Sequence, residues 1–161
     1  MNTEKLKIKI YFDTVILWEE LCILHKKLFD LTNEEYLELL SGQVDKLSDI
    51  IDEKSRIVKK INSVDFNRLK ILNDINNDLN TPVKSYKELL LYFSDIKIEQ
   101  RKSILKEFNN LLIDIVKKIQ EQNKKNQLFL NKAICSLDEI SERAPGRIRN
   151  STYDSTGSLK R

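Results

Sequence analysis

Long stretches of this chain contain neither glycine nor proline, and this absence limits the folds open to it. The 161 residues include three glycines and two prolines, at Gly42, Pro82, Pro145, Gly146 and Gly157. Because these residue types punctuate turns and end helices, segments that lack them favour long helices. Hydrophobic residues make up 40% of the chain and charged residues 33%, enough for one core beneath a charged surface. One mainly helical domain is therefore expected.

Apolar residues of the segment 4–31 recur every three or four residues, as on one face of a helix. They form two adjacent rows, which make a face too wide for a two-stranded coiled coil, so this helix is expected to contact at least two neighbours. Thr32 and Glu35 have the spacing of a capping box, which predicts a kink or restart at 30–33. The rows are Ile10, Thr14, Leu17, Leu21, Leu24, Leu28 and Leu31, and Tyr11, Val15, Trp18, Cys22, His25 and Phe29.

The segment 35–61 continues with the same period. Gly42 lies inside it, and because glycine costs a helix only about 1 kcal/mol relative to alanine, we expect the helix to bend there and to continue. Lys54 is the single polar residue in the row. Its apolar members are Leu37, Leu40, Val44, Leu47, Ile51, Val58 and Ile61.

The middle of the chain, 62–100, is the least regular part. The stretch 73–80 is polar and typical of a turn. Thr81 followed by Pro82 has the pattern of a helix N-cap with proline at the first helical position, which predicts a short helix from Pro82 to about Phe93.

The last helix is predicted to run from about Lys97 to Arg143, capped by Ser94 or Asp95. At ~1.5 Å per residue it would be about 70 Å long, too long for a compact globule of this mass. The sequence thus predicts an all-α fold: an elongated antiparallel bundle of about three long helices and a shorter middle helix. The seam of the last helix contains Ile104, Phe108, Leu111, Ile115, Ile119, Phe129, Ala133, Leu137 and Ile140.

Two domains are expected: a helical bundle, residues 1–143, and a flexible basic tail, residues 144–161. Pro145 and Gly146 end the last helix, and the tail has too few apolar residues to stay ordered alone. The net charge of +3 lies entirely in this tail, which has four basic residues and one acidic residue, so the bundle is neutral overall.

The charge and hydropathy patterns exclude several classes of partner. Lysines alternate with acidic residues along the predicted helices and form no basic stripe, so nucleic acid is not an expected partner. No run of about 18 apolar residues without charge is present, and no signal peptide is recognised, so neither membrane insertion nor secretion is expected. Two widely separated cysteines suit reduced thiols. These features favour a cytoplasmic protein.

No catalytic or metal site is predicted. Cys22 and His25 lie three residues apart and share a helical face, but a tetrahedral zinc site needs more ligands, and both belong to an apolar row where packing explains them. The acidic clusters around Glu34 and Asp49 lie among lysines and suit solvated helix faces. Without a glycine-rich loop there is no phosphate cradle, so we expect a non-enzymatic protein without a cofactor.

Amide side chains interrupt the seam of the last helix. Steps of three and four residues from Ile119 reach Gln122, Asn126 and Phe129, with Asn123 beside them. Polar residues on a seam often fix register at some cost in stability. The other interpretation is that the amides face a groove occupied by a partner, and the sequence leaves both open.

Three blocks together resemble the FlgN family of flagellar export chaperones. The block Glu35–Lys54 is similar to that family's acidic residue and leucine pair, followed by a small break and then a leucine and a lysine. The block Ile119–Leu128 has two asparagines three residues apart before an aliphatic helix, and the block Thr152–Ser158 resembles the family's tail motif of tyrosine, turn residue and glycine.

The resemblance implies a chaperone that binds the carboxy-terminal helix of unassembled hook–filament junction proteins. Its implied partners also include the flagellar export gate and components of the export ATPase complex. The resemblance also implies that Tyr153 and Gly157 dock on the export gate, and it implies no bound nucleotide or metal. A stripe on the last helix is the expected client site, which is helix-in-groove recognition. The residues assigned to the client site are Asn123, Asn126, Leu130, Ile134, Leu137 and Ile140.

Other classes remain open from the sequence. The residues of the stripe have a competing role, which is to pack in the core of the bundle. The protein as a whole has two alternatives to the chaperone function: a structural or adaptor bundle of a secretion system, which would self-associate stably, and a regulatory module that binds another protein.

Overall fold

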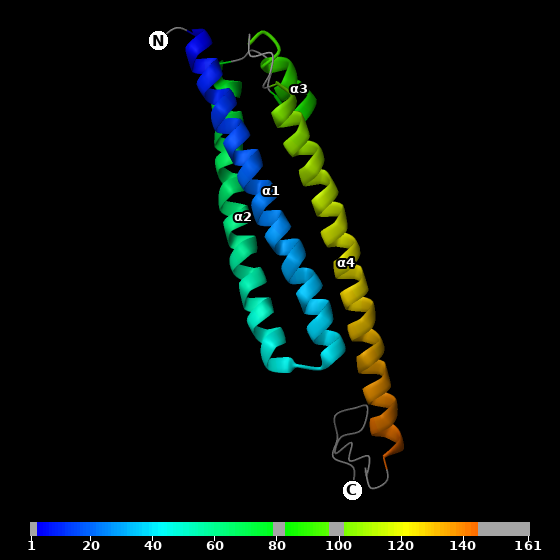
Figure 1. Ribbon diagram of the computed structural model, residues 1–161. Coiled ribbons are helices and arrows are strands. Elements are labelled where there is room, and N and C mark those ends of the chain that lie inside the picture. The colour runs from blue at the N-terminus through cyan, green and yellow to red at the C-terminus, as the bar shows by residue number, and fades with distance from the viewer. Residues whose placement is uncertain (1–2, 79–82, 97–101, 145–161) are drawn as a thin grey trace, which may run out of the picture. The chain divides into compact units, whose positions relative to one another are not determined.

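The computed structural model describes residues 3–78, 83–96 and 102–144, without the side chains of Thr3, Asp78 and Lys102. Every regular element in these ranges is a helix, which confirms the all-α prediction with three long helices and a shorter middle one (Figure 1). The helices are α1 (Thr3–Ser41), α2 (Val44–Asp78), α3 (Tyr86–Tyr92) and α4 (Lys102–Arg143).

The chain divides into two compact units within α4. The first unit is Met1–Asn126 and the second is Gln127–Arg161. In the first unit α1 and α2 form an antiparallel hairpin (Figure 1). Hydrogen bonds pair Trp18 with Asn109 and, further along both helices, Thr32 with Asn126, so α4 runs parallel to α1. The second unit contains the remainder of α4, up to Arg143.

Contrary to the expected kink at 30–33, α1 continues without a break to Ser41. Thr32 is fully buried, and its hydroxyl donates to the backbone oxygen of Leu28 at 2.7 Å. The side chain is therefore satisfied within its own helix and caps no helix N-terminus. The capping-box interpretation was wrong because the spacing of Thr32 and Glu35 is not specific once both face neighbouring helices.

The prediction that a helix continues past Gly42 is also wrong. Gly42 has φ +72°, a left-handed conformation that ends α1, and its N–H donates to the backbone oxygen of Glu38 at 2.9 Å. Only Gly42 and Gln43 separate the two helices. The cost of glycine inside a helix does not decide this position, because reversing the chain lets α1 and α2 bury their apolar faces against each other.

Gly42→Ala is expected to lower the free energy of unfolding by about 1 kcal/mol. A Cβ at this position would meet no atom within 4 Å, so the cost arises from the left-handed backbone alone. Gly42→Asn is expected to cost less, since asparagine tolerates that conformation. Urea denaturation of the three proteins measures the difference. Equal stability of the alanine variant and the unmodified protein would show that the turn does not require this conformation.

The apolar row predicted for 35–61 crosses the break at Gly42, and most of it faces solvent. Because α1 ends at Ser41 and α2 begins as a new helix, the two helices need not turn the same face towards the core. The row is therefore continuous in sequence but not in space. Exposed members of the row are Leu37, Leu40, Val44, Ile51 and Val58, whereas the buried positions of α2 are Ile57, Val64 and Ile75.

The segment 73–80 is not a turn where it is described, because α2 continues to Asp78. The following short helix begins after Ser85 and not at Pro82, which lies outside the described residues with Thr81. The Ser85 hydroxyl accepts from the N–H of Glu88 at 3.2 Å, and the Glu88 carboxylate accepts from the N–H of Ser85, completing a capping box. The hydrogen bond from the backbone N–H of Lys84 is the largest cause lowering the pKa of Glu88.

Aromatic residues fill the core where α3 meets the long helices. The rings of Tyr11 and Phe93 meet edge to face at 5.2 Å between centroids. Trp18 is buried, its indole N–H donates to Asn109 at 3.2 Å, and the guanidinium of Arg68 lies 5.6 Å from its ring. Both apolar rows of α1 contribute buried residues, which agrees with the wide apolar face predicted from the sequence.

The last helix ends at Arg143, as predicted. Its predicted start at Lys97 and the tail after Ala144 lie outside the described residues. The domain boundary between 143 and 144 stays a prediction.

Candidate functional site

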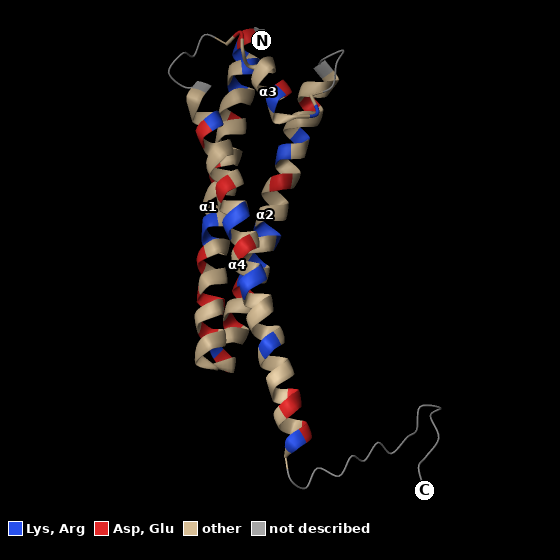
Figure 2. Cartoon of the chain, turned by 90° about the vertical axis from the view of Figure 1, so that its right-hand side faces the viewer, with Lys and Arg blue, Asp and Glu red and all other residues tan. Residues whose placement is uncertain are grey.

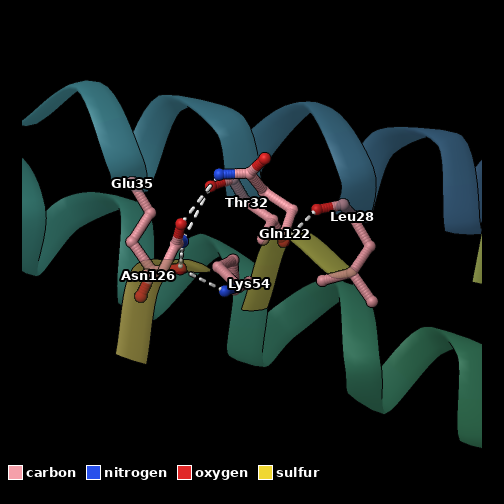
Figure 3. Close-up of polar contacts among 6 residues, drawn as sticks. All are labelled: Leu28, Thr32, Glu35, Lys54, Gln122 and Asn126. Carbon is pink, nitrogen blue, oxygen red and sulfur yellow. Dashed lines mark hydrogen bonds and ion pairs between the residues drawn. The ribbon is translucent and has the colours of Figure 1, made fainter. Parts of the chain in front are cut away.

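A polar network crosses the first unit and joins α1, α2 and α4 (Figure 3). The side-chain N–H groups of Asn126 donate to the backbone oxygen of Thr32 and to a carboxylate oxygen of Glu35, each at 3.0 Å. Lys54 donates to the same Glu35 oxygen at 2.5 Å. Gln122 donates to the side-chain oxygen of Asn126 at 2.9 Å, so one amide is bonded at both ends.

The network lies largely out of solvent. Asn126 is 5% exposed, and the side chains of Glu35 and Lys54 are 19% and 18% exposed. Buried polar groups cost free energy unless they are hydrogen bonded, so sliding α4 along α1 would leave several of these groups unsatisfied. For Gln122 and Asn126, this geometry favours the first of the two interpretations of the seam amides, namely that they fix the register of α4.

An exposed apolar stripe follows Asn126 along α4. Steps of three or four residues place its members on one face of the helix. No described residue of α4 after Asn126 is buried. The stripe consists of Leu130, Ile134, Leu137 and Ile140, which are 45%, 48%, 65% and 66% exposed.

This exposure bears on the choice between core packing and docking. Unpaired aliphatic side chains in a row are rare on a monomer surface unless a partner covers them. Leu128 and Cys135 are exposed on the opposite face of α4. Lys132 lies within the stripe segment, and Asp138 and Glu139 follow towards its end.

Asn123, Tyr153 and Gly157 are the other residues that the sequence assigned to a site. Asn123 is exposed on α4, three residues before Asn126. Tyr153 and Gly157, assigned to export-gate docking, lie outside the described residues. Their roles stay predictions.

A groove of about 520 Å³ lies between α1 and α4 in the first unit. Cys22 lines it, as do Phe29, Phe108 and Leu111. The Cys22 thiol donates to the backbone oxygen of Phe108 at 3.2 Å, and the ring of His25 bonds to the backbone oxygen of Leu21 at 2.7 Å. Both candidate zinc ligands are thus engaged with backbone groups.

The described residues bring no three His, Cys, Asp or Glu side chains together as potential metal ligands. Basic and acidic residues are interspersed along the described helices (Figure 2). Among these helices, none has both the length and the apolar character that crossing a bilayer requires.

The two cysteines are expected to differ in reactivity by about tenfold or more towards a disulfide reagent at pH 8. Burial is the main cause that raises the pKa of the Cys22 thiol, with the charge of Glu19 second, so little thiolate forms there, whereas Cys135 is exposed. Cys22→Ala and Cys135→Ala identify the two phases of the reaction. Equal rates in the folded protein would contradict the burial of Cys22, and in denaturant the rates should converge.

Glu35 belongs to the acidic cluster expected on a solvated face, and this expectation is wrong for Glu35, which bonds to Asn126 and Lys54 and is largely buried. The sequence did contain a signal for this pair. Lys54 is the one polar residue in an apolar row, and the first family-like block begins at Glu35 and ends at Lys54. Their pairing depends on the chain reversal at Gly42, which the spacing did not predict.

The described residues form a helical bundle that carries exposed rows of aliphatic side chains, the kind of surface that binds other proteins. The family model described as FlgN protein matches residues 15–161, and the chain therefore belongs to the FlgN family. Membership makes it a flagellar export chaperone, which binds flagellar export substrates during flagellum assembly. No curated protein and no solved structure matches the chain.

Proposed function

We propose that this protein binds the carboxy-terminal helical segment of an unassembled hook–filament junction protein along the α4 stripe. Binding covers the surface through which the subunit polymerises and so prevents premature assembly. The complex forms in the cytoplasm and is delivered to the export gate, with components of the export ATPase complex as further partners. The observation that carries the proposal is the exposure of Leu130, Ile134, Leu137 and Ile140.

The stripe suits an amphipathic helix. Its four aliphatic side chains lie within eleven residues, about 15 Å of helix, which is the length over which a partner helix presents three or four anchors. One such stripe buries limited area, which favours reversible binding over a permanent assembly.

The direct test is to purify the protein from its native cytosol and identify what accompanies it. The proposal expects a junction protein that is lost when that protein's carboxy-terminal helix is deleted. Recovery of the protein only as a homo-oligomer would favour the structural-bundle alternative and contradict the proposal.

Tyr153→Ala is expected to leave client affinity unchanged and to reduce delivery. The family-like tail motif motivates this assignment, and a short segment that orders on contact binds weakly and reversibly, which suits recycling of the chaperone. Client affinity, export-gate affinity and secretion are measured for the variant. Unchanged gate binding and secretion would sink the assignment, and lost client affinity would move Tyr153 into the client site.

A further inference from the structure

A second exposed apolar surface lies on α2, in the first unit. Val44, Ile51 and Val58 recur every seven residues and are 74%, 49% and 41% exposed. Seven residues are close to two helical turns, so the three side chains form one row about 21 Å long. Ser48 and Ser55 follow the first two by four residues and lie on the same face. We name this surface, made of these five residues, the α2 row.

The end of the α1–α2 hairpin that includes most of the α2 row is strongly acidic. Residues 34–54 contain seven acidic and two basic side chains, a net charge of −5, although the chain as a whole is positive. Within the described ranges, no ion pair engages Asp45, Asp49 or Asp52, and all three are exposed. Asp45 and Asp52 each follow an apolar member of the row by one residue, so carboxylates border Val44 and Ile51, whereas Lys59 follows Val58.

The apolar side chains and the carboxylates together restrict the kind of partner that can cover the α2 row. Anionic lipid surfaces and nucleic acids would be repelled by the carboxylates. A second copy of the chain would bring two acidic hairpin ends together, with Asp45, Asp49 and Asp52 of each copy close to those of the other, which is unfavourable. A helix with an apolar face and basic flanks complements both the aliphatic side chains and the charge, and the serines leave room for its larger side chains.

We propose that the α2 row is a docking surface for a basic amphipathic helix of a partner protein. The partner helix places aliphatic side chains over Ser48 and Ser55, between Val44, Ile51 and Val58, while its lysines or arginines face Asp45 and Asp52. This surface is separate from the α4 stripe and does not depend on the proposed client.

The proposal is tested with a fluorescent synthetic peptide of about 18 residues, with leucines at helical three- and four-residue spacing and lysines on both flanks. A second peptide has glutamate in place of every lysine. Fluorescence anisotropy at moderate salt is expected to show binding of the lysine peptide and at least about tenfold weaker binding of the glutamate peptide. Backbone amide chemical shifts of the protein are expected to move mainly in 44–58.

Two variants separate the apolar and charged contributions. Val44→Ser with Ile51→Ser is expected to weaken the lysine peptide about tenfold, and Asp45→Asn with Asp49→Asn and Asp52→Asn about fivefold. Because these side chains are exposed, thermal melting should be nearly unchanged. The matched control removes three exposed carboxylates elsewhere, in the variant Asp13→Asn, Glu20→Gln and Glu107→Gln.

Three results would overturn the proposal. The first is equal weakening by the acidic triple variant and by its control, which would indicate unspecific charge attraction. The second is unchanged affinity when Val44 and Ile51 are serine. The third is sedimentation of the free protein as a dimer that the same two serines dissociate, which would assign the row to a second copy of the chain.

Discussion

Replacing Ile134 and Leu137 with aspartate is expected to weaken client binding at least about 100-fold while the protein stays folded. Each substitution would place a carboxylate in an interface that excludes water, and no basic group on this face of α4 is positioned to compensate it. Both residues are about half exposed or more in the free protein, so the bundle should tolerate the change. Titration with a purified carboxy-terminal segment of a junction protein measures the affinity, and circular dichroism measures the helix content.

Leu128→Asp with Cys135→Asp is the matched control. It adds the same two charges to the same part of α4, but on the opposite face, where both side chains are exposed. The control should bind the client at nearly full affinity. A stripe variant that binds as well as the control would exclude the stripe as the client site, and one that unfolds would make Ile134 and Leu137 core residues.

Glu35→Ala is expected to lower the free energy of unfolding by about 2–3 kcal/mol. One carboxylate oxygen accepts hydrogen bonds from both Lys54 and Asn126, so truncation leaves a largely buried ammonium and a buried amide without this partner. Urea denaturation measures the change. The neighbouring Glu34 is exposed, so Glu34→Ala should change stability by no more than about 0.5 kcal/mol.

A double-mutant cycle with Asn126→Ala separates the network from its parts. Because Glu35 and Asn126 share a hydrogen bond at 3.0 Å, the two losses should not add, with a coupling of about 1 kcal/mol. Additive losses, or a Glu35→Ala variant as stable as Glu34→Ala, would show that the network does not hold the register of α4.

The helices themselves were predictable because their signal is local. Apolar periodicity and the scarcity of glycine and proline are properties of short windows, and they correctly gave three long helices, one short one and the end of α4 at Arg143. The error at Gly42 arose where the outcome depends on distant contacts, because the chain reverses there to pack α1 and α2 on each other. The start of α3 follows a local signal, since Ser85 and Glu88 have the spacing of a capping box, whereas the pattern of Thr81 and Pro82 predicted a start four residues too early.

The candidate site shows the same division. The stripe could be predicted because Leu130, Ile134, Leu137 and Ile140 follow helical spacing. The same spacing is typical of core residues, and only the exposure of the side chains separates a docking surface from a core. Asn126 was recognised as unusual on a seam. Its partners Thr32 and Glu35 lie on α1, and Lys54, which donates to Glu35, lies on α2. No local pattern relates residues that meet only after the chain has folded.

The most direct measurement of the central claim is amide hydrogen exchange of the intact protein, free and saturated with the junction-protein segment. Docking on the stripe predicts that the client slows exchange most strongly in peptides covering 128–143. Protection confined to other parts of the protein, with exchange in 128–143 unchanged by a saturating client, would contradict the claim.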